Sequence, residues 1–134
     1  MLDALDVSAS ALAAQRMRTE VITNNLANAH TTRDAFGRLN PYRRQDVVFR
    51  VGAKGHPGTA GVHVEKIVTD SSPLRLEHDP GHPDANAEGF VLMPNVNPVV
   101  EMVNLMDATR AYELNVTAMD ATKGLFNAAL RILA

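Results

Sequence analysis

Histidines and carboxylates gather in one turn-rich stretch and are the first candidates for chemistry. The cluster consists of His78, Asp79, His82 and Asp84, with His56 and His63 upstream. Two histidines four positions apart form a zinc pair when a helix places them on one face, but Pro80, Gly81 and Pro83 prevent a helix here. The alternative is a solvated loop whose side chains hold its own turns. We expect that loop, with no metal and no cofactor, and a type II turn at Asp79-Pro80-Gly81.

Arg43 and Arg44 beside Tyr42 form a second candidate, since arginine can grip a phosphate through two parallel hydrogen bonds. The alternative, which we favour, is a solvated or salt-bridged surface. The glycines of residues 51–61 lack the spacing of a phosphate-binding loop, and no helical pattern follows them. Because no nucleophile, base and orienting group come together in the sequence, we expect no catalysis.

Composition limits the partners of the chain. Its 134 residues carry a formal net charge of -2 with scattered basic residues, whereas a nucleic-acid surface needs a positive patch. The absence of cysteine excludes disulfides and cysteine-bound metals. Asp3 and Asp6 stand where a secretory signal would carry basic residues, and no apolar stretch reaches the ~20 residues of a membrane span. We expect no nucleic-acid partner, no cleaved signal peptide and no direct membrane insertion.

The positions of helix breakers divide the chain into three regions. All seven prolines and seven of the eight glycines lie between Gly37 and Pro98. The flanking regions are rich in alanine, leucine and methionine, which favour helix. We expect a mainly α fold with a coiled-coil-like hairpin of two helices. Its parts are an N-terminal assembly helix (1–36), a small, irregular, turn-rich β-containing middle region (37–97) and a C-terminal heptad helix (98–134).

Short strands are predicted in the middle region. Residues 46–51, 62–69 and 89–93 combine β-branched or apolar residues with flanking turn signals. Between the last two strands, residues 77–89 read as a long loop. The middle region is thus expected to form short strands joined by turns.

The C-terminal helix is predicted to start where Asn97 can cap it and Pro98 can occupy its first turn. A seven-residue repeat follows. One line of the repeat is Leu105, Tyr112, Met119, Phe126 and Leu133, and the other is Met102, Thr109, Val116, Lys123 and Leu130. The first helix repeats less regularly, because apolar residues occupy more than one of its sides. Periodicity alone does not separate an intramolecular core from an assembly surface, but this wide coverage favours assembly.

Three asparagines crowd the end of the first helix, although asparagine is poor in a helix interior. Asn24 and Asn28 are four apart and share a face, where their amides could fix the register against a neighbour, as a buried polar residue does in coiled coils. The alternative is that Asn24, Asn25 and Asn28 simply cap the helix end. Asn28 also suits the left-handed conformation that ends many helices.

Two long motifs resemble a known family. The stretch VSASALAAQRMRTEVITNNLANAHTT (7–32) resembles the signature shared by bacterial flagellar rod and hook subunits. The stretch that begins HDPGHPDANAEGF and continues through PNVN and RAYE (78–116) resembles the flagellar proximal rod family, FlgC. The short length agrees, since distal rod and hook subunits carry larger middle domains.

The resemblance implies a structural subunit that polymerises into the helical drive shaft of the flagellar basal body and transmits torque across the periplasm. Implied partners are copies of itself, other rod subunits, the type III export apparatus and basal-body rings. The resemblance also implies export in an unfolded state, which fits the expected lack of a cleaved signal. Residues expected at the assembly interface are Leu5, Leu12, Ile22, Asn24, Asn25, Leu26, Asn28, Met102, Leu105, Tyr112, Val116, Met119, Phe126, Leu130 and Leu133.

Two other functions remain open on the residues alone. One is a non-flagellar helical binding module that presents a groove to a partner helix. The other is an enzyme that uses the loop from His78 to Asp84.

Overall fold

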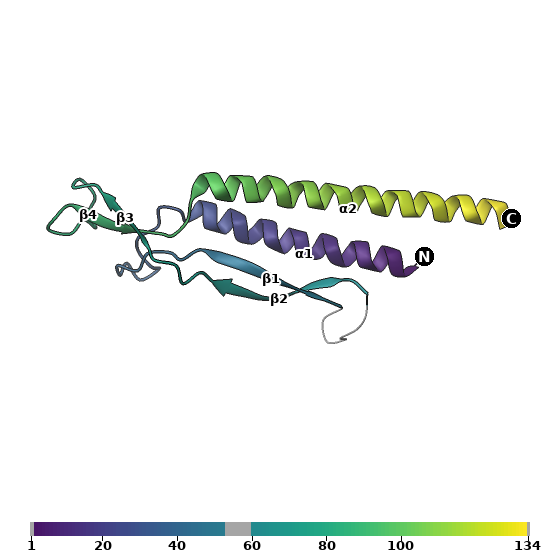
Figure 1. The fold of residues 1–134 in the computed structure, drawn as a ribbon, viewed down its shortest axis with the longest axis horizontal. Coiled ribbons are helices and arrows are strands. Elements are labelled where there is room, and N and C mark those ends of the chain that lie inside the picture. The colour runs from purple at the N-terminus through teal and green to yellow at the C-terminus, as the bar shows by residue number, and fades with distance from the viewer. Residues whose placement is uncertain (1, 53–59, 134) are drawn as a thin grey trace.

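Two long helices dominate the computed structural model, which describes residues 2–52 and 60–133. Helix α1 spans Leu2–Ala27 and helix α2 spans Pro98–Leu133. They run antiparallel as a hairpin, and both chain ends lie toward the same end of the molecule (Figure 1). With 36 residues against 26, α2 is ten residues longer, so about 15 Å of it extends beyond the start of α1.

The start of α2 is capped as predicted. The side-chain oxygen of Asn97 accepts hydrogen bonds from the backbone N–H groups of Val99 at 3.0 Å and Val100 at 3.4 Å. Pro98 takes the first helical position, where its missing N–H costs nothing. The cap satisfies donors that have no partner inside the helix.

The end of α1 differs from the prediction. The helix stops at Ala27, so the segment up to residue 36 is not helical. Asn28 is not left-handed, because every residue with positive φ among those described is a glycine. Instead, tightening turns close the helix, with Ala29 N–H donating to Leu26 O at 3.3 Å and Thr31 N–H to Asn28 O at 3.1 Å. Local hydrogen bonding thus replaces the left-handed cap.

Four strands form two separate two-stranded antiparallel sheets in the described residues. Strands β1 (Gln45–Val51) and β2 (Val62–Thr69) pair with each other, as do β3 (Arg75–His78) and β4 (Phe90–Met93). The three predicted strands match β1, β2 and β4. Strand β3 was not predicted, and it takes Glu77 and His78 out of the expected loop. All four of its residues are exposed. A strand with no buried side needs no alternation of apolar and polar residues, which is the pattern by which strands are recognised in a sequence.

The turn after β3 is not of the predicted type. His82 N–H donates to Asp79 O at 3.2 Å, which closes a four-residue turn, but Gly81 does not have the positive φ that a type II turn requires. The Asp79 carboxylate accepts a hydrogen bond from Gly81 N–H at 3.1 Å instead. This side-chain bond stabilises a turn in which glycine has no special conformational role.

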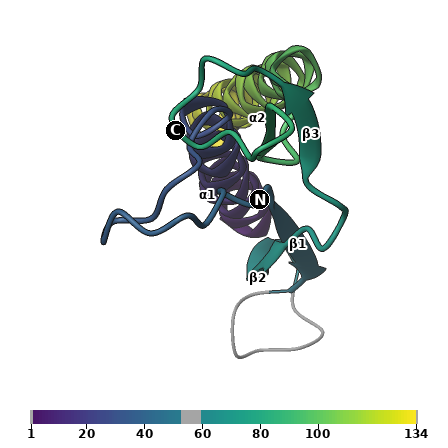
Figure 2. The same cartoon turned by 90° about the vertical axis from the view of Figure 1, so that its left-hand side faces the viewer.

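Helix α1 lies between α2 on one side and the β1–β2 hairpin on the other (Figures 1 and 2). Its buried residues include Ala14, Val21 and Ile22. The hairpin is held close, because Ser10 Oγ accepts a hydrogen bond from Val62 N–H at 3.1 Å. The apolar residues predicted on more than one side of α1 therefore meet two neighbouring elements within the chain itself.

Few large side chains are fully buried, and they gather where α2 begins. Val91, Met93 and Val96 are at most 6 % exposed and lie in β4 and the link to α2. Within residues 2–52 and 60–133, neither helix combines enough length with enough apolar character to cross a membrane.

Candidate assembly surface

One face of α2 packs on α1, and it contains half of the predicted heptad. Most of the less exposed residues of α2 recur at alternating spacings of three and four, and Tyr112 and Phe126 on the same line are each 39 % exposed. This inner stripe comprises Glu101, Leu105, Ala108, Tyr112, Asn115, Met119, Thr122, Phe126 and Ala129. The predicted line through Leu105, Tyr112 and Met119 thus faces α1, whereas Leu133 has no described side chain.

The second predicted heptad line lies beside the inner stripe and not within it. Met102 is 52 % exposed and Leu130 49 %, whereas Val116, at 36 %, is about as exposed as Tyr112 in the inner stripe. The line that completes the inner stripe instead consists of small or polar residues such as Ala108 and Asn115. Small side chains allow two helices to pack closely. The prediction of the heptad relied on large apolar side chains and therefore did not include these positions. On α1, Ile22 is buried, and Leu5, Leu12 and Leu26 are half-buried.

The opposite face of α2 is exposed and mostly apolar, interrupted by Arg110 and Thr117. Its positions recur at spacings of four, three and four residues, an eleven-residue period close to that of a straight helix. This outer stripe comprises Val99, Val103, Met106, Arg110, Leu114, Thr117, Ala121, Leu125, Ala128 and Ile132. Leu114 is 70 % exposed and Ile132 is 84 % exposed. Exposed, mostly apolar surfaces of this kind are typical of contacts with another protein.

A buried polar junction joins α1, α2 and β1 at the base of the helix hairpin. Asn25 is 0 % exposed and Glu101 is 1 % exposed. The Asn25 amide donates to Glu101 Oε2 at 3.0 Å and to Gln45 O at 2.8 Å. Its oxygen accepts from Tyr42 Oη–H and from Gln45 N–H, both at 2.9 Å. Every bonding group of this amide is used inside the chain.

Arg44 completes the junction by neutralising the buried carboxylate. Its Nε lies 2.8 Å from Glu101 Oε1, in a pair that is largely removed from water. Burial alone would lower the pKa of Arg44, but hydrogen bonding to Glu101 and Asp46 outweighs it and raises the pKa. Burial, together with the charge of Glu101, raises the pKa of the Tyr42 hydroxyl. Both shifts hold Arg44 charged and Tyr42 protonated, the states that their hydrogen bonds require.

The three asparagines therefore have different surroundings. Asn25 lies in the junction, where its capacity for bonding to a neighbouring subunit is already filled. Asn24 is exposed, and Asn28 donates from its side chain to the backbone oxygen of Asn24 at 2.9 Å. The sequence offered one signal for the junction, since Glu101 is an acidic residue within an apolar stretch that directly follows a helix cap.

The predicted loop is tied to the segment that follows α1. Asp84 has a 2 % exposed side chain and forms an ion pair with Arg33, which is 52 % exposed. Thr32 Oγ1–H donates to the second oxygen of Asp84 at 2.6 Å. These two hydrogen bonds, from Thr32 and then Arg33, lower the pKa of Asp84. The carboxylate is thereby held charged, and the loop is fixed to the base of the helix hairpin.

The histidines do not assemble a metal site in the described residues. No group of three or more histidine and acidic side chains there could hold an ion. His78 packs edge-on against Phe90 with ring centroids 4.9 Å apart, His82 Nδ1 accepts from Asp84 N–H, and His63 Nδ1 lies 2.5 Å from Gly52 O. His56 lies outside the described residues. The side chains of His63, His78 and His82 thus contact turns and strand ends.

The two arginines proposed for phosphate have other partners. Arg44 is in the junction, and Arg43 Nη1–H donates to Ser72 O at 3.1 Å. The salt-bridged alternative thus accounts for Arg44.

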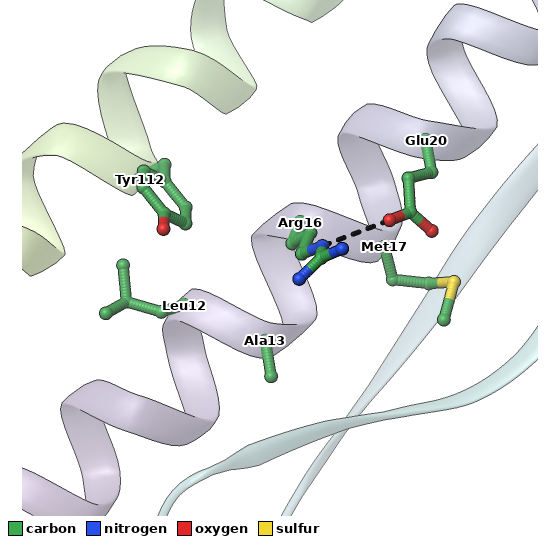
Figure 3. A pocket seen from close by; sticks show the side chains of 6 residues that line it. All are labelled: Leu12, Ala13, Arg16, Met17, Glu20 and Tyr112. Carbon is green, nitrogen blue, oxygen red and sulfur yellow. Dashed lines mark hydrogen bonds and ion pairs between the residues drawn. The ribbon is translucent and has the colours of Figure 1, made fainter.

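A groove opens on the side of the helix hairpin, as Figure 3 shows. It encloses about 420 Å³, and we call it the α1–α2 groove. Its lining consists of Leu12, Ala13, Arg16, Met17, Glu20 and Tyr112. Arg16 Nε lies 3.1 Å from Glu20 Oε1, with both side chains mostly exposed. The groove therefore has apolar walls and a carboxylate in a surface ion pair.

Two protein-family models match the chain. The model described as "Flagella basal body rod protein" matches residues 5–33. The model described as "Flagellar basal body rod FlgEFG protein C-terminal" matches residues 87–132. The matches thus cover nearly all of α1, and β4 with nearly all of α2.

Whole-length relatives are similar throughout. The flagellar basal-body rod protein FlgC of Bacillus subtilis is 48 % identical over 143 aligned residues, which cover 96 % of this chain and 95 % of the relative. The FlgC protein of Borreliella burgdorferi is 41 % identical, covering 99 % and 97 % of the two chains. That of Salmonella typhimurium is 42 % identical, covering 93 % and 92 %.

Proposed function

Because the chain belongs to the FlgC family of flagellar basal-body rod proteins, we propose that it builds the rod by packing the outer stripe of α2 against helices of neighbouring subunits. It is a structural subunit of the basal-body rod and not an enzyme. It assembles with other components of the rod and the basal body. These neighbours include copies of the same chain, and contact with basal-body rings follows from the position of the rod.

The observation that carries this proposal is the exposure of the outer stripe. A helix that is apolar on two opposite faces needs a neighbour on each, and α1 covers only one of them. The burial of Leu114 or Val103 would remove apolar surface from water, at about 25 cal/mol per Å². The eleven-residue period of the stripe suits a partner helix that runs nearly straight, without a left-handed supercoil.

Other residues of the predicted interface lie beside the two stripes and would add to the contact between subunits. Met102, Val116 and Leu130 are exposed beside the inner stripe and extend the contact surface of α2. Asn24 is exposed on α1 and can fix the register against a neighbour. Asn25 acts differently, since it positions α1 and α2 within one subunit.

Assembly of this kind would follow export. The chain would leave the cytoplasm unfolded through the flagellar type III apparatus. It would then fold and polymerise in the periplasm into the shaft that transmits torque. Torque transmission needs lateral contacts along the length of the rod, and a long helix with two apolar faces offers such contacts.

The test is a charge placed on the outer stripe. Leu114→Glu adds a carboxylate at an exposed position, so the folded monomer should be nearly unaffected, whereas burial of the charge in an assembly is costly. We expect unchanged circular dichroism of the monomer, no rods by electron microscopy and loss of swimming. Asn24→Leu, measured in the same way, should keep helix content but give irregular polymers.

Ala118→Glu is the matched control, since Ala118 is exposed on α2 outside both stripes. It should assemble normally. Normal rods from Leu114→Glu would show that the outer stripe is not an assembly surface.

A further inference from the structure

The short segment after α1 carries an aromatic side chain on a rigid support. We call residues 33–39 the tip. A bridge between Arg33 and Leu39 closes it, and Gly37 supplies a φ of 75°. The Asp34 carboxylate accepts hydrogen bonds from Phe36 N–H at 2.9 Å and from Arg38 N–H at 3.0 Å. The backbone of the tip is therefore fixed by its own side chains.

Phe36 is exposed at the end of this support. Its exposed fraction is 83 %, and the Arg38 guanidinium lies 5.0 Å from the centre of its ring. This guanidinium also pairs with Asp34 at 2.9 Å, but it is 73 % exposed, so it can face a second carboxylate. The segment that follows α1 projects away from both helices (blue in Figure 2). A large apolar side chain held rigidly in water, with a cation over its ring, has the composition of an interface anchor.

The α1–α2 groove has the complementary character. Leu12, Met17 and Tyr112 offer apolar contact along an open groove of about 420 Å³, which is wide enough to receive an aromatic ring on one side. Glu20 is 53 % exposed, and within the part of the chain that the structure describes its carboxylate pairs with Arg16 alone, itself 78 % exposed. Such a surface pair is weak, so Glu20 can receive a second cation.

The tip cannot fill the groove of its own chain. Met17 and Glu20 lie roughly two to three helical turns before the end of α1, while the tip follows that end and points away from the helices. The groove therefore needs a tip from elsewhere.

We propose that the tip of one subunit inserts Phe36 into the α1–α2 groove of a second copy, with Arg38 of the first facing Glu20 of the second. Tip and groove lie on different parts of one chain, so the contact is head-to-tail. A head-to-tail contact that does not close into a ring generates an open helical polymer. The inference rests on the proposed rod function and adds to it a contact between successive subunits.

Disulfide cross-linking tests the contact, because the native chain contains no cysteine. Ala35→Cys, beside Phe36 on the tip, and Ala13→Cys are made in separate chains, since both positions are exposed and Phe36 is kept. The two chains are mixed, assembled and oxidised with copper phenanthroline. We expect a covalent dimer of the two chains. Ala35→Cys mixed with Ala118→Cys, at an exposed position outside both stripes, is the control and should give none.

A second measurement avoids cysteine. Phe36→Ala should fold normally and raise the critical concentration for assembly about tenfold or more, as the loss of an aromatic anchor does. Absence of the specific dimer in assembled polymer, or an unchanged critical concentration for Phe36→Ala, would overturn the contact. If rods still formed in that case, the outer stripe would remain the assembly surface, and only the contact between tip and groove would be refuted. If no rods form, the same cross-linking is done on the mixed chains at high concentration. A covalent dimer that exceeds the control supports the contact, and its absence refutes it.

Discussion

Asn25→Ala tests whether the buried junction holds the helix hairpin together. The substitution removes four hydrogen bonds, to Glu101, to Tyr42 and two to Gln45, at 2.8 to 3.0 Å. Neutral hydrogen bonds contribute about 0.5–1.5 kcal/mol each and one to a charge about 1.5–3 kcal/mol. The sum is about 3–7.5 kcal/mol, and entry of water beside the partly exposed Arg44 lowers it. We expect a loss of roughly 3–4 kcal/mol.

That loss is a large part of the about 5–15 kcal/mol by which a domain is stable. The assay is urea unfolding of the monomer, followed by circular dichroism and extrapolated linearly to water. Asn24→Ala is the matched control, since it changes the same residue type one position away at an exposed site, and it should stay within about 0.5 kcal/mol of the unmodified chain. If Asn25→Ala fell within about 1 kcal/mol of Asn24→Ala, the junction would not hold the hairpin.

Two further predictions concern glycine and pH. Gly61→Ala should destabilise the monomer by about 1–3 kcal/mol, because φ is 109° and a new Cβ would lie 2.7 Å from Ser10 Oγ. Gly124→Ala is the control: it lies within a helix with open space around it and should stabilise the monomer by about 0.5–1 kcal/mol. Urea unfolding measures both free energies, and equal effects would contradict the close contact of β2 with α1. The pKa of Asp84 is lowered below 3.8, so its ionised form stabilises the folded state at higher pH and that contribution is lost as pH falls through the folded pKa. The stability difference between the unmodified chain and Asp84→Asn should therefore be constant near neutral pH and shrink below pH 3.8, and a difference that does not change with pH would refute the ion pair with Arg33.

The sequence determined the elements that depend on local chemistry. The cap at Asn97 and Pro98, the two long helices and the strands from residue 46 and from residue 62 all follow from propensity, capping and short-range pattern. The flagellar motifs at both ends of the chain are sufficient to identify the family. Local signals suffice in these places because the hydrogen bonds that define them join residues close in the chain.

Only the tertiary structure decided which partner each face meets. The heptad of α2 showed that one side is apolar, but packing selected Ala108 and Asn115 as the second line facing α1 and left Met102 exposed, because close helix approach favours small residues. Asn25 reads as one of three equivalent asparagines, yet its partner Glu101 lies 76 residues away. Strand β3 exists through its pairing with β4 and has no pattern of its own. Pairings over such separations depend on how the whole chain folds, and that information is not contained in any short segment.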